Sequence, residues 1–397
     1  MSSGPLDGLL VLDLGRFVAG PVAATVLGEF GARVIKVERP GTGDDLRRLG
    51  WSKDGNSLWW SVEARNKDSI TLDLHKPEGA ALLLDLAERA DVVVENFRPG
   101  TLERWGLGWD ELHARNERLI LLRTSGYGQV GPYSQRAAFN TAVESLGGLR
   151  YIMGEPDRPP ARPGIALGDY TGALTGVIGV LLALADRQRT GQGQWIDNAL
   201  FESVMRITEY TVPAFQQLGR VRERIGAESV GTVPARSFQC ADGTWVGVSA
   251  ANDAMFARLC KAMERPELAD DPRVRTNADR IQNSTWIHDI IGEWIGQHAP
   301  DEVLAALSAA EVSASEVLSS ARLVEDAHVL ARQSVIEVDD PILGRTLMQN
   351  IVPRLSANPG RIEHAGPILG SANDSVYGGL LALSKQQQDD LRAAGVI

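Results

Sequence analysis

The stretch LLVLDLGRFVAGPVAATVLGEFGARVIKV, residues 9–37, decides the fold of this chain. It opens with the continuous apolar run Leu9–Leu14 and closes with a second one, Arg33–Val37. Between these runs, Pro21 suits the first turn of a helix that we expect to reach Phe30. Apolar strands without alternation, joined by a helix, are typical of a parallel sheet that is covered on both faces.

The same alternation continues through the first half of the chain. Pro77–Ala90 has the pattern of a second helix, and further strand-like runs are Ile70–Leu74, Asp91–Asn96, Leu119–Arg123 and Trp195–Ala199. We therefore predict an α/β fold whose large, Rossmann-like domain with a mostly parallel sheet occupies residues 1–205. A helical pattern after Phe201 reaches about Gly219, and residues 206–234 are interpreted as a linker.

A second pattern starts near residue 235. Ser237–Cys240 and Trp245–Ser249 flank an Asp-Gly turn and predict a β-hairpin. Helical patterns follow around residues 253–263, 284–297 and 300–309, so residues 235–330 are predicted to form a smaller α+β domain. Residues 331–397 return to short strand-like pieces, end in a predicted helix at Ser384–Ala394, and are expected to complete the large domain.

Composition narrows the classes of function. The formal net charge of -11 argues against a nucleic-acid or anionic-membrane partner. Cys240 and Cys260 form no CxxC motif, which makes a disulfide framework or a zinc site improbable and fits a cytoplasmic protein. The N-terminus lacks the features of a signal peptide. The longest apolar stretch, Gly172–Ala185, is too short to span a bilayer and is interpreted as a buried helix.

The first strand-to-helix turn, Leu14–Pro21, lacks the GxGxxG fingerprint of dinucleotide-binding folds, which removes the main support for a nicotinamide oxidoreductase. Instead, residues 12–45 resemble the start of the class III CoA-transferases. The resemblance continues through RNKDSITLDLHKPEG (65–79), ADVVVENFRPGTLERWGLG (90–108), SGYGQVGPY (125–133), RPGIALGDYTGAL (162–174), RTGQGQWID (189–197) and RSFQCADGTWVGV (236–248).

The resemblance implies a fold and an activity. Members of this family have a large domain built from both chain ends, a small domain and long linkers, and two chains form an interlocked homodimer. They move coenzyme A between carboxylic acids, so acyl-CoA and a carboxylic acid are the expected substrates, with no permanently bound cofactor and no metal. A non-catalytic acyl-CoA-binding protein on the same scaffold, and an oxidoreductase, stay open as alternatives.

Asp169, in Leu167-Gly168-Asp169-Tyr170, matches the catalytic nucleophile of the family. In that role its carboxylate would hold first an acyl group and then CoA. The sequence around it predicts an apolar helix from Tyr170 to Gln188, and an Asp just before a helix is usually its N-cap. Both roles stay open, and they can coexist.

The resemblance also implies binding residues. Those matched to CoA contacts are Phe17, Val18, Arg39, Leu72, His75, Asn96, Phe97, Arg98, Arg104 and Arg136. Phe139 and Asn140 are expected beside the acyl group, and Arg16 is a candidate for binding a distal carboxylate. A salt bridge at the surface or at a dimer interface is the alternative role for Arg16. Gly126, Gly128 and Gly131 predict a loop in which backbone approaches a ligand closely, or an ordinary turn.

Departures from the family's branches narrow the activity. The racemase branch carries a His-Asp pair where this chain has Phe139-Asn140, and a glutamate where it has Asn252, so proton shuttling is not expected. Val18 replaces the glutamine of formyl-CoA transferase, and the tetraglycine loop of that enzyme is missing. Asn252 and the stretch GTVPARSF (231–238) are similar to the succinate–hydroxymethylglutarate branch. A dicarboxylate such as succinate is therefore the expected donor or acceptor.

Overall fold

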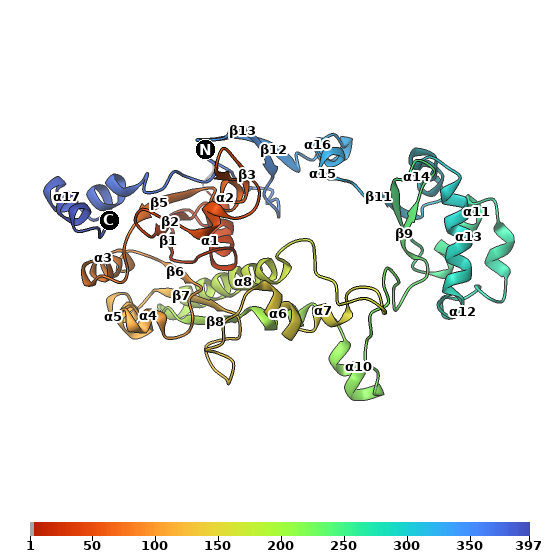
Figure 1. Cartoon of the computed structure of the whole chain (residues 1–397), viewed down its shortest axis with the longest axis horizontal. Coiled ribbons are helices and arrows are strands. Elements are labelled where there is room, and N and C mark those ends of the chain that lie inside the picture. The colour runs from red at the N-terminus through yellow and green to blue at the C-terminus, as the bar shows by residue number, and fades with distance from the viewer. Residues whose placement is uncertain (1–3) are drawn as a thin grey trace. The chain divides into compact units, whose positions relative to one another are not determined.

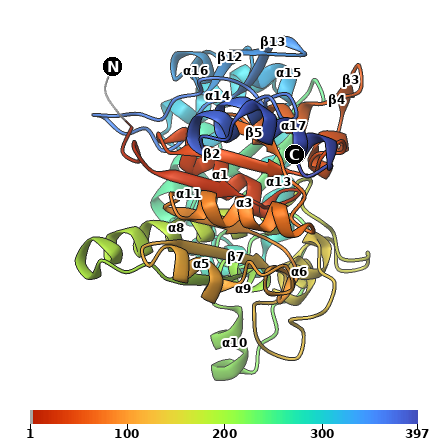
Figure 2. The same cartoon turned by 90° about the vertical axis from the view of Figure 1, so that its left-hand side faces the viewer.

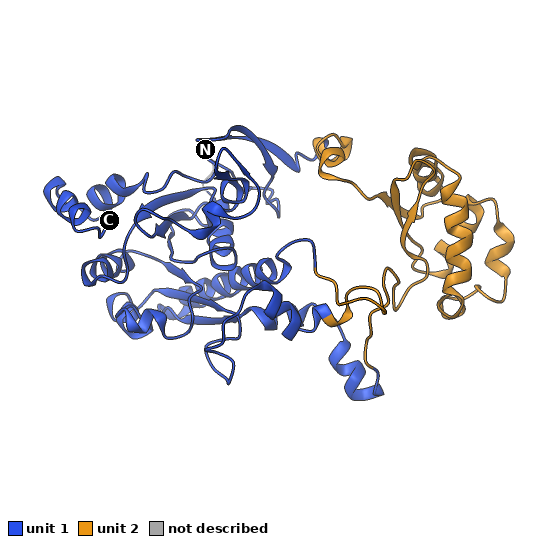
Figure 3. Ribbon diagram, viewed as in Figure 1, with its two compact units in different colours: residues 1–150, 163–220, 331–397 blue, residues 151–162, 221–330 orange. Residues whose placement is uncertain are grey.

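The computed structural model describes residues 4–397 and divides the chain into two compact units, each described by itself (Figure 3). The first unit consists of residues up to 150 together with 163–220 and 331–397. The second unit consists of residues 151–162 and 221–330. Both ends of the chain thus belong to the first unit.

A six-stranded sheet forms the centre of the first unit, with the strand order β5-β2-β1-β6-β7-β8 and parallel pairing throughout. The strands are β1 (Leu10–Asp13), β2 (Arg33–Glu38), β5 (Lys67–Thr71), β6 (Val92–Glu95), β7 (Ile120–Ser125) and β8 (Trp195–Ala199). The predicted α/β class with a parallel sheet is confirmed. The strand expected at 70–74 begins earlier, at Lys67, and ends at Thr71, and the backbone N–H of Asp73 donates to the carbonyl of Val396 instead of to a neighbouring strand.

The strand order reverses direction at β1. Chain order runs outward from β1 through β2 to β5 on one side, and through β6 and β7 to β8 on the other. The loops after β1 and β6 therefore separate at the carboxyl edge, where ligands bind in open α/β sheets. Two hydrogen bonds of 2.7 Å join these loops, from the backbone N–H of Arg16 to Asn96 Oδ1 and from Asn96 Nδ2 to the Arg16 carbonyl.

Helices cover both faces of the sheet (Figure 1). Side chains alternate along β1, so that Leu10 and Leu12 enter one apolar cluster and Val11 enters the other. The Leu10 face packs on α3 (Pro77–Ala87), α4 (Thr101–Arg104) and α5 (Trp109–Arg115), and the Val11 face packs on α1 (Ala19–Glu29), α2 (Leu58–Glu63) and α8 (Leu167–Thr190). Figure 2 shows α3 and α5 on the side that faces the viewer.

The long helix α8 differs from its prediction in two ways. It begins at Leu167, so Asp169 lies inside the first turn and Ala166 is the N-cap. It is buried on one face only, because Leu174 and Leu182 on the opposite face are 53% and 66% exposed. By length and composition alone α8 could cross a membrane, and 39% of its apolar stretch is buried. The core helices of globular proteins meet the same criterion.

The predicted helix after Phe201 is two helices, α9 (Leu200–Arg206) and α10 (Thr211–Leu218). A continuous helix would need an N–H at Pro213 to reach the carbonyl of Glu209, and proline has none. The remaining elements before residue 163 are η1 (Asp45–Arg48), β3 (Ser52–Lys53), β4 (Asn56–Ser57), α6 (Asn140–Leu146) and α7 (Leu149–Ile152).

The C-terminal segment returns to the first unit. It forms the antiparallel hairpin β12 (Val335–Asp340) and β13 (Gly344–Gln349), the π-helical turn η3 (Asp374–Leu380) and α17 (Lys385–Ala393). The predicted C-terminal helix is confirmed, and Ser384 caps it by accepting the Gln387 backbone N–H.

The second unit has a three-stranded antiparallel sheet in the order β11-β10-β9. The predicted hairpin is β9 (Ala235–Gln239) with β10 (Trp245–Ser249), and β11 (Ser313–Glu316) adds the third strand. The helical elements are α11 (Asp253–Ala262), η2 (Pro266–Asp270), α12 (Asn277–Gln282), α13 (Ser284–Gly296), α14 (Pro300–Ala309) and α15 (Ser320–Leu323), followed by α16 (Ala327–Ala331) at the boundary between the units. Asn252 is the N-cap of α11, since its Oδ1 accepts the Met255 N–H at 2.9 Å.

Candidate active site

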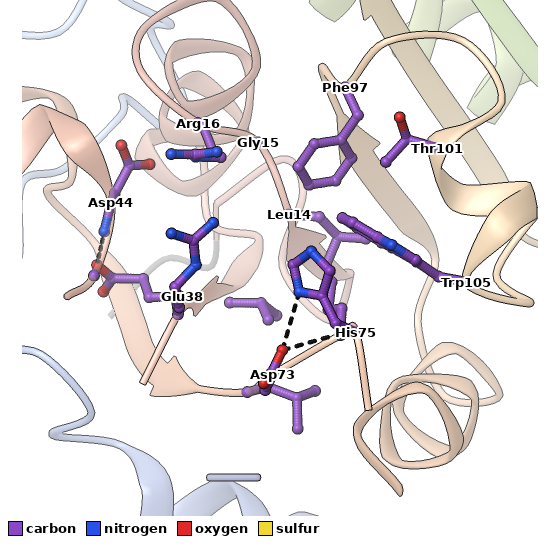
Figure 4. A pocket seen from close by; sticks show the side chains of 15 residues that line it. Leu14, Gly15, Arg16, Glu38, Asp44, Asp73, His75, Phe97, Thr101 and Trp105 are labelled. Atoms are coloured by element: carbon purple, nitrogen blue, oxygen red, sulfur yellow. Dashed lines mark hydrogen bonds and ion pairs between the residues drawn. The ribbon is translucent and has the colours of Figure 1, made fainter. Parts of the chain in front are cut away.

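Two pockets adjoin at the carboxyl edge of the large sheet, where the loops after β1 and β6 separate. Arg16, Phe97 and Thr101 line both of them. The rest of the first pocket comes from Leu14, Gly15, Val37, Glu38, Arg39, Gly43, Asp44, Leu72, Asp73, Leu74, His75 and Trp105 (Figure 4). The rest of the second pocket comes from Phe17, Val18, Ala19, Asn96, Arg98, Pro99, Thr124, Ser125, Gly126, Ser134, Arg136, Ala137, Ala138, Phe139, Asp169 and Leu200.

The first pocket combines aromatic rings with a basic group. The ring of Trp105 lies 5.2 Å from that of Phe97 and 4.6 Å from that of His75, and Figure 4 shows the three side chains on one side of the pocket. Within the described part of the chain, the exposed guanidinium of Arg39 has no ion-pair partner. Rings beside a free guanidinium suit a planar base that carries phosphate groups.

Asp169 lines the second pocket with a carboxylate that no described residue neutralises or caps. Its backbone N–H donates to Asn140 Oδ1 at 3.3 Å, but no donor among residues 4–397 bonds its side chain. Burial, and then the nearby charge of Glu144, raise the pKa of Asp169 from 3.8 to about 6. The N-cap interpretation is therefore wrong, because the side chain lies past the cap position and is aimed into the pocket lining.

The loop that carries Arg16 and Phe17 rests on buried charges that the sequence reasoning missed. The backbone N–H of Phe17, whose φ is 63°, donates to Asp44 Oδ1 at 3.0 Å. Lys36 Nζ lies 2.9 Å from Asp44 Oδ2 and also donates to the Gly15 carbonyl. Burial alone would lower the pKa of Lys36, but the carboxylates of Asp13, Asp44 and Glu38 together outweigh burial and raise it. The cluster holds the left-handed Phe17 backbone in place.

A second buried pair supports the loop after β6. Glu95 Oε2 accepts the Phe97 N–H at 2.7 Å, and Glu95 Oε1 accepts from Arg123 Nε at 3.0 Å. Burial raises the pKa of Glu95 to about 7, although Arg123 opposes that rise. Arg123 also contacts Glu103 at 2.8 Å. These contacts orient the residues Asn96 to Arg98, which line the second pocket.

The structure brings most of the predicted site residues to these pockets, and Arg104 and Asn140 line neither. Arg104 is exposed and donates to Thr101 Oγ1 at 2.9 Å, one residue away from the lining. Asn140 stands behind Asp169. Arg16 forms an ion pair with Asp45, so the alternative of a surface salt bridge is realised while Arg16 still lines both pockets.

Three exposed residues in the lining of the second pocket, Arg98, Arg136 and Phe139, differ in their contacts. Phe139 is 67% exposed, and its ring meets that of Phe17 at 5.6 Å in an edge-on arrangement. The guanidinium of Arg136 lies 3.7 Å from the centre of the Tyr133 ring. Neither Arg98 nor Arg136 has a carboxylate partner among residues 4–397. The lining of the second pocket therefore includes two guanidinium groups, Arg98 and Arg136, without a carboxylate partner among residues 4–397.

Glycine at position 126 is required by packing. A Cβ there would lie 2.1 Å from the Cβ of Ala138, so any side chain would push the two loops apart. Gly128 and Gly131 have φ of 84° and 92°, which suits glycine, but they line a neighbouring hollow and not the second pocket.

Comparisons with known proteins agree on one family. The protein-family model described as CoA-transferase family III matches residues 6–373 of this chain. Succinyl-CoA–D-citramalate CoA-transferase of Chloroflexus aurantiacus is 46% identical over 394 residues, which cover 99% of this chain and 98% of that protein. The β subunit of succinyl-CoA–L-malate CoA-transferase from the same organism is 45% identical over 397 residues, with 99% and 98% coverage.

Solved structures lead to the same assignment. The crystal structure of a CaiB/BaiF family protein from Brucella suis matches with a TM-score of 0.85 and 32% identity, over 96% of this chain and 100% of that one. A family model that spans most of the chain, near-complete relatives and a matching fold are consistent with each other. The chain belongs to CoA-transferase family III and is a CoA-transferase.

Proposed function

We propose that this CoA-transferase moves coenzyme A from the CoA thioester of a dicarboxylic acid, such as succinyl-CoA, to a second carboxylic acid, with Asp169 as the covalent nucleophile. The observation that carries the proposal is the uncompensated carboxylate of Asp169 in the lining of the second pocket. A carboxylate without a cationic partner keeps its charge available for attack, and its raised pKa increases its nucleophilicity.

The transfer has two halves. The Asp169 carboxylate attacks the thioester carbonyl, the C–S bond breaks, and CoA leaves as a thiolate, so that a mixed anhydride remains. The thiolate then attacks the aspartyl carbonyl, the donor acid leaves as a carboxylate, and Asp169 holds CoA as a thioester. The acceptor carboxylate repeats these steps in reverse order, which regenerates Asp169 and releases the new acyl-CoA. No ATP is consumed, because one thioester replaces another.

The first pocket supports the proposal as a site for the nucleotide end of CoA. The cluster of rings formed by Phe97, Trp105 and His75 suits packing against adenine, and Arg39 suits a phosphate. Arg16 lines both pockets. We therefore propose that its guanidinium binds either an anionic group of CoA that lies between the two pockets or the distal carboxylate of the acid. CoA is a substrate in this proposal, and we expect no permanently bound cofactor.

The names of the relatives support the dicarboxylate class. Two of them are named for succinyl-CoA with D-citramalate and with L-malate, and a human relative, 31% identical over 394 residues, is named for succinyl-CoA and glutarate. We further propose a cytoplasmic homodimer. The exposed apolar stripe of α8, which includes Leu174, Ile178 and Leu182, supports a protein partner for that face.

The proposal is tested with a panel of acyl-CoA donors and carboxylic acids, read by mass spectrometry of the CoA products. Dicarboxylic acids are expected to accept CoA at least about tenfold faster than monocarboxylic acids of the same length, since a hydrogen bond between charged groups contributes about 1.5–3 kcal/mol. Asp169→Ala should abolish transfer, and hydroxylamine should trap an Asp169 adduct in the wild type only. Full transfer by Asp169→Ala would overturn the proposal.

A further inference from the structure

Glu144 on α6 is a completely buried carboxylate directly behind the second pocket. Its Oε2 accepts from Arg150 at 3.0 Å (Nε) and 2.9 Å (Nη2). Its Oε1 accepts from Asn140 Nδ2 at 2.8 Å. Both carboxylate oxygens of Glu144 are therefore bonded to donors, one on α6 and one on α7. These hydrogen bonds fix the position of the Glu144 carboxylate.

Asn140 connects this carboxylate to the nucleophile. Because Glu144 takes the NH2 end of the amide, the oxygen end faces the first turn of α8 and accepts the Asp169 N–H at 3.3 Å. Gly168 allows this approach, since a Cβ at that position would lie 2.8 Å from Asn140 Oδ1. The orientation of the Asn140 amide, and with it the position of the Asp169 backbone, depends on Glu144.

The charges around Asp169 come from several elements. Glu63 on α2 accepts a hydrogen bond from the hydroxyl of Tyr170, the residue after Asp169, at 2.6 Å. Burial and Glu144 are the two causes that raise the pKa of Asp169. The cations that line the same pocket from three different loops are Arg16, Arg98 and Arg136.

We propose that Glu144 is a positioning residue that prepares Asp169 for acylation, by fixing the Asn140 amide and by placing a second, permanently held negative charge behind the nucleophile. This inference rests on the proposed function of Asp169. It assigns to the Arg150–Glu144–Asn140 chain a task in the chemical step as well as in the packing of α6 against α8.

The physical reason lies in the charge of Asp169 through the reaction. As a free carboxylate it is negative, whereas in the mixed anhydride and in the CoA thioester its side chain is neutral, because the charge leaves with the thiolate and then with the donor acid. Among these three states of the Asp169 side chain, a fixed negative charge nearby destabilises only the free carboxylate. Glu144 therefore shifts the equilibrium toward the acylated enzyme and lowers the barrier to attack.

The test compares three variants of the full-length protein. Glu144→Gln removes the charge in a side chain of the same shape, and Glu144→Gln/Arg150→Met removes both charges, so that the test survives if the single variant does not fold. Arg150→Lys keeps the ion pair and is the matched control. The measurements are the acidic limb of the pH profile of kcat/KM with succinyl-CoA, and the fraction of enzyme trapped as the Asp169–CoA thioester by intact mass.

Both variants without the Glu144 charge should move the acidic limb from about pH 6 down by about one pH unit and reduce the thioester equilibrium constant about tenfold. Arg150→Lys should leave both quantities close to wild type. An unmoved limb and an unchanged thioester fraction in the Glu144 variants would overturn the role of Glu144. Absence of any thioester in the wild type would instead count against the proposed function, so the two failures are distinguishable.

Discussion

The first unit contains two groups of buried charges that are arranged in opposite ways. Under the loop after β1, Asp13 and Asp44 alternate with Lys36 and Lys67, and the ion-pair distances from Asp13 to Lys67 and from Asp44 to Lys36 are 2.9 Å each. Beside the second pocket, Asp169 has a like-charged neighbour, Glu144, and no bonded cation among residues 4–397. Both groups belong to the same folded unit.

The two groups differ in their tasks: the paired charges hold a backbone segment in place, whereas the unpaired carboxylate of Asp169 is available for chemistry. Compensated charges in a low-dielectric interior are fixed by their partners, so they hold the Phe17 loop without reacting. A buried carboxylate beside a second one has no such partner, and its charged form is held at higher free energy than in water. Such local conflict is found at functional sites and is sustained by the stability of the rest of the fold.

Breaking the compensated group should have the largest effect. Lys36→Met leaves Asp44 as a buried carboxylate without a cationic partner, while Asp13 keeps Lys67, so we expect the free energy of unfolding to fall by about 3–5 kcal/mol. Urea denaturation at pH 7.5 measures this change. Lys53→Met, at an exposed position, is the control and should stay within about 0.5 kcal/mol of wild type. Equal losses in the two variants would contradict the comparison.

Removing the charge of Asp169, which has no cationic partner, should raise the free energy of unfolding instead of lowering it. The pKa of Asp169 is raised to about 6 in the folded chain, whereas an unfolded aspartate ionises near 3.9. The folded chain holds the extra proton between these values, so the stability that this proton contributes is complete below about pH 4 and is lost as the pH rises to 6. The side chain of Asp169→Asn is neutral at every pH, so this variant does not lose stability as the pH rises from about 4 to 6.

At pH 7.5 we therefore expect Asp169→Asn to be more stable than wild type by up to about 3 kcal/mol, while transfer is lost. The gain should disappear when the same denaturation is repeated near pH 3.5. Asp7→Asn, at an exposed position, is the matched control and should show little gain at either pH. A gain for Asp169→Asn that is the same at both pH values would show that burial of the charge is not its cause.

The smallest effect on stability is expected at the half-exposed pair of Arg16 and Asp45, whose side chains are 39% and 28% exposed. Arg16→Gln should change the free energy of unfolding by no more than about 1 kcal/mol, because water screens such pairs. The KM for a dicarboxylic acid should nevertheless rise about tenfold or more, while that for a monocarboxylic acid stays unchanged. An unchanged KM for both acids would contradict the assignment of Arg16 to the distal carboxylate.

The order of strands and helices could be predicted from the sequence because its signals are local. Trp195–Ala199 and Pro300–Ala309 have the bounds that the apolar pattern and the leading proline predict. The start of α8 could not be predicted in this way. It depends on Gly168 packing against Asn140 and on Gly172 packing against Leu200, and both contacts join segments that are distant in sequence.

The sequence by itself determined an α/β chain with a parallel sheet and, through its motifs, a family and a set of residues that includes Asp169. Only the tertiary structure decided that Lys36 is buried in a compensated cluster, that Asp169 is not a helix cap, and that Glu144 stands behind it. The physical reason is that hydrophobic periodicity acts between neighbours along the chain, whereas burial and Coulomb interactions act between any groups that folding brings close.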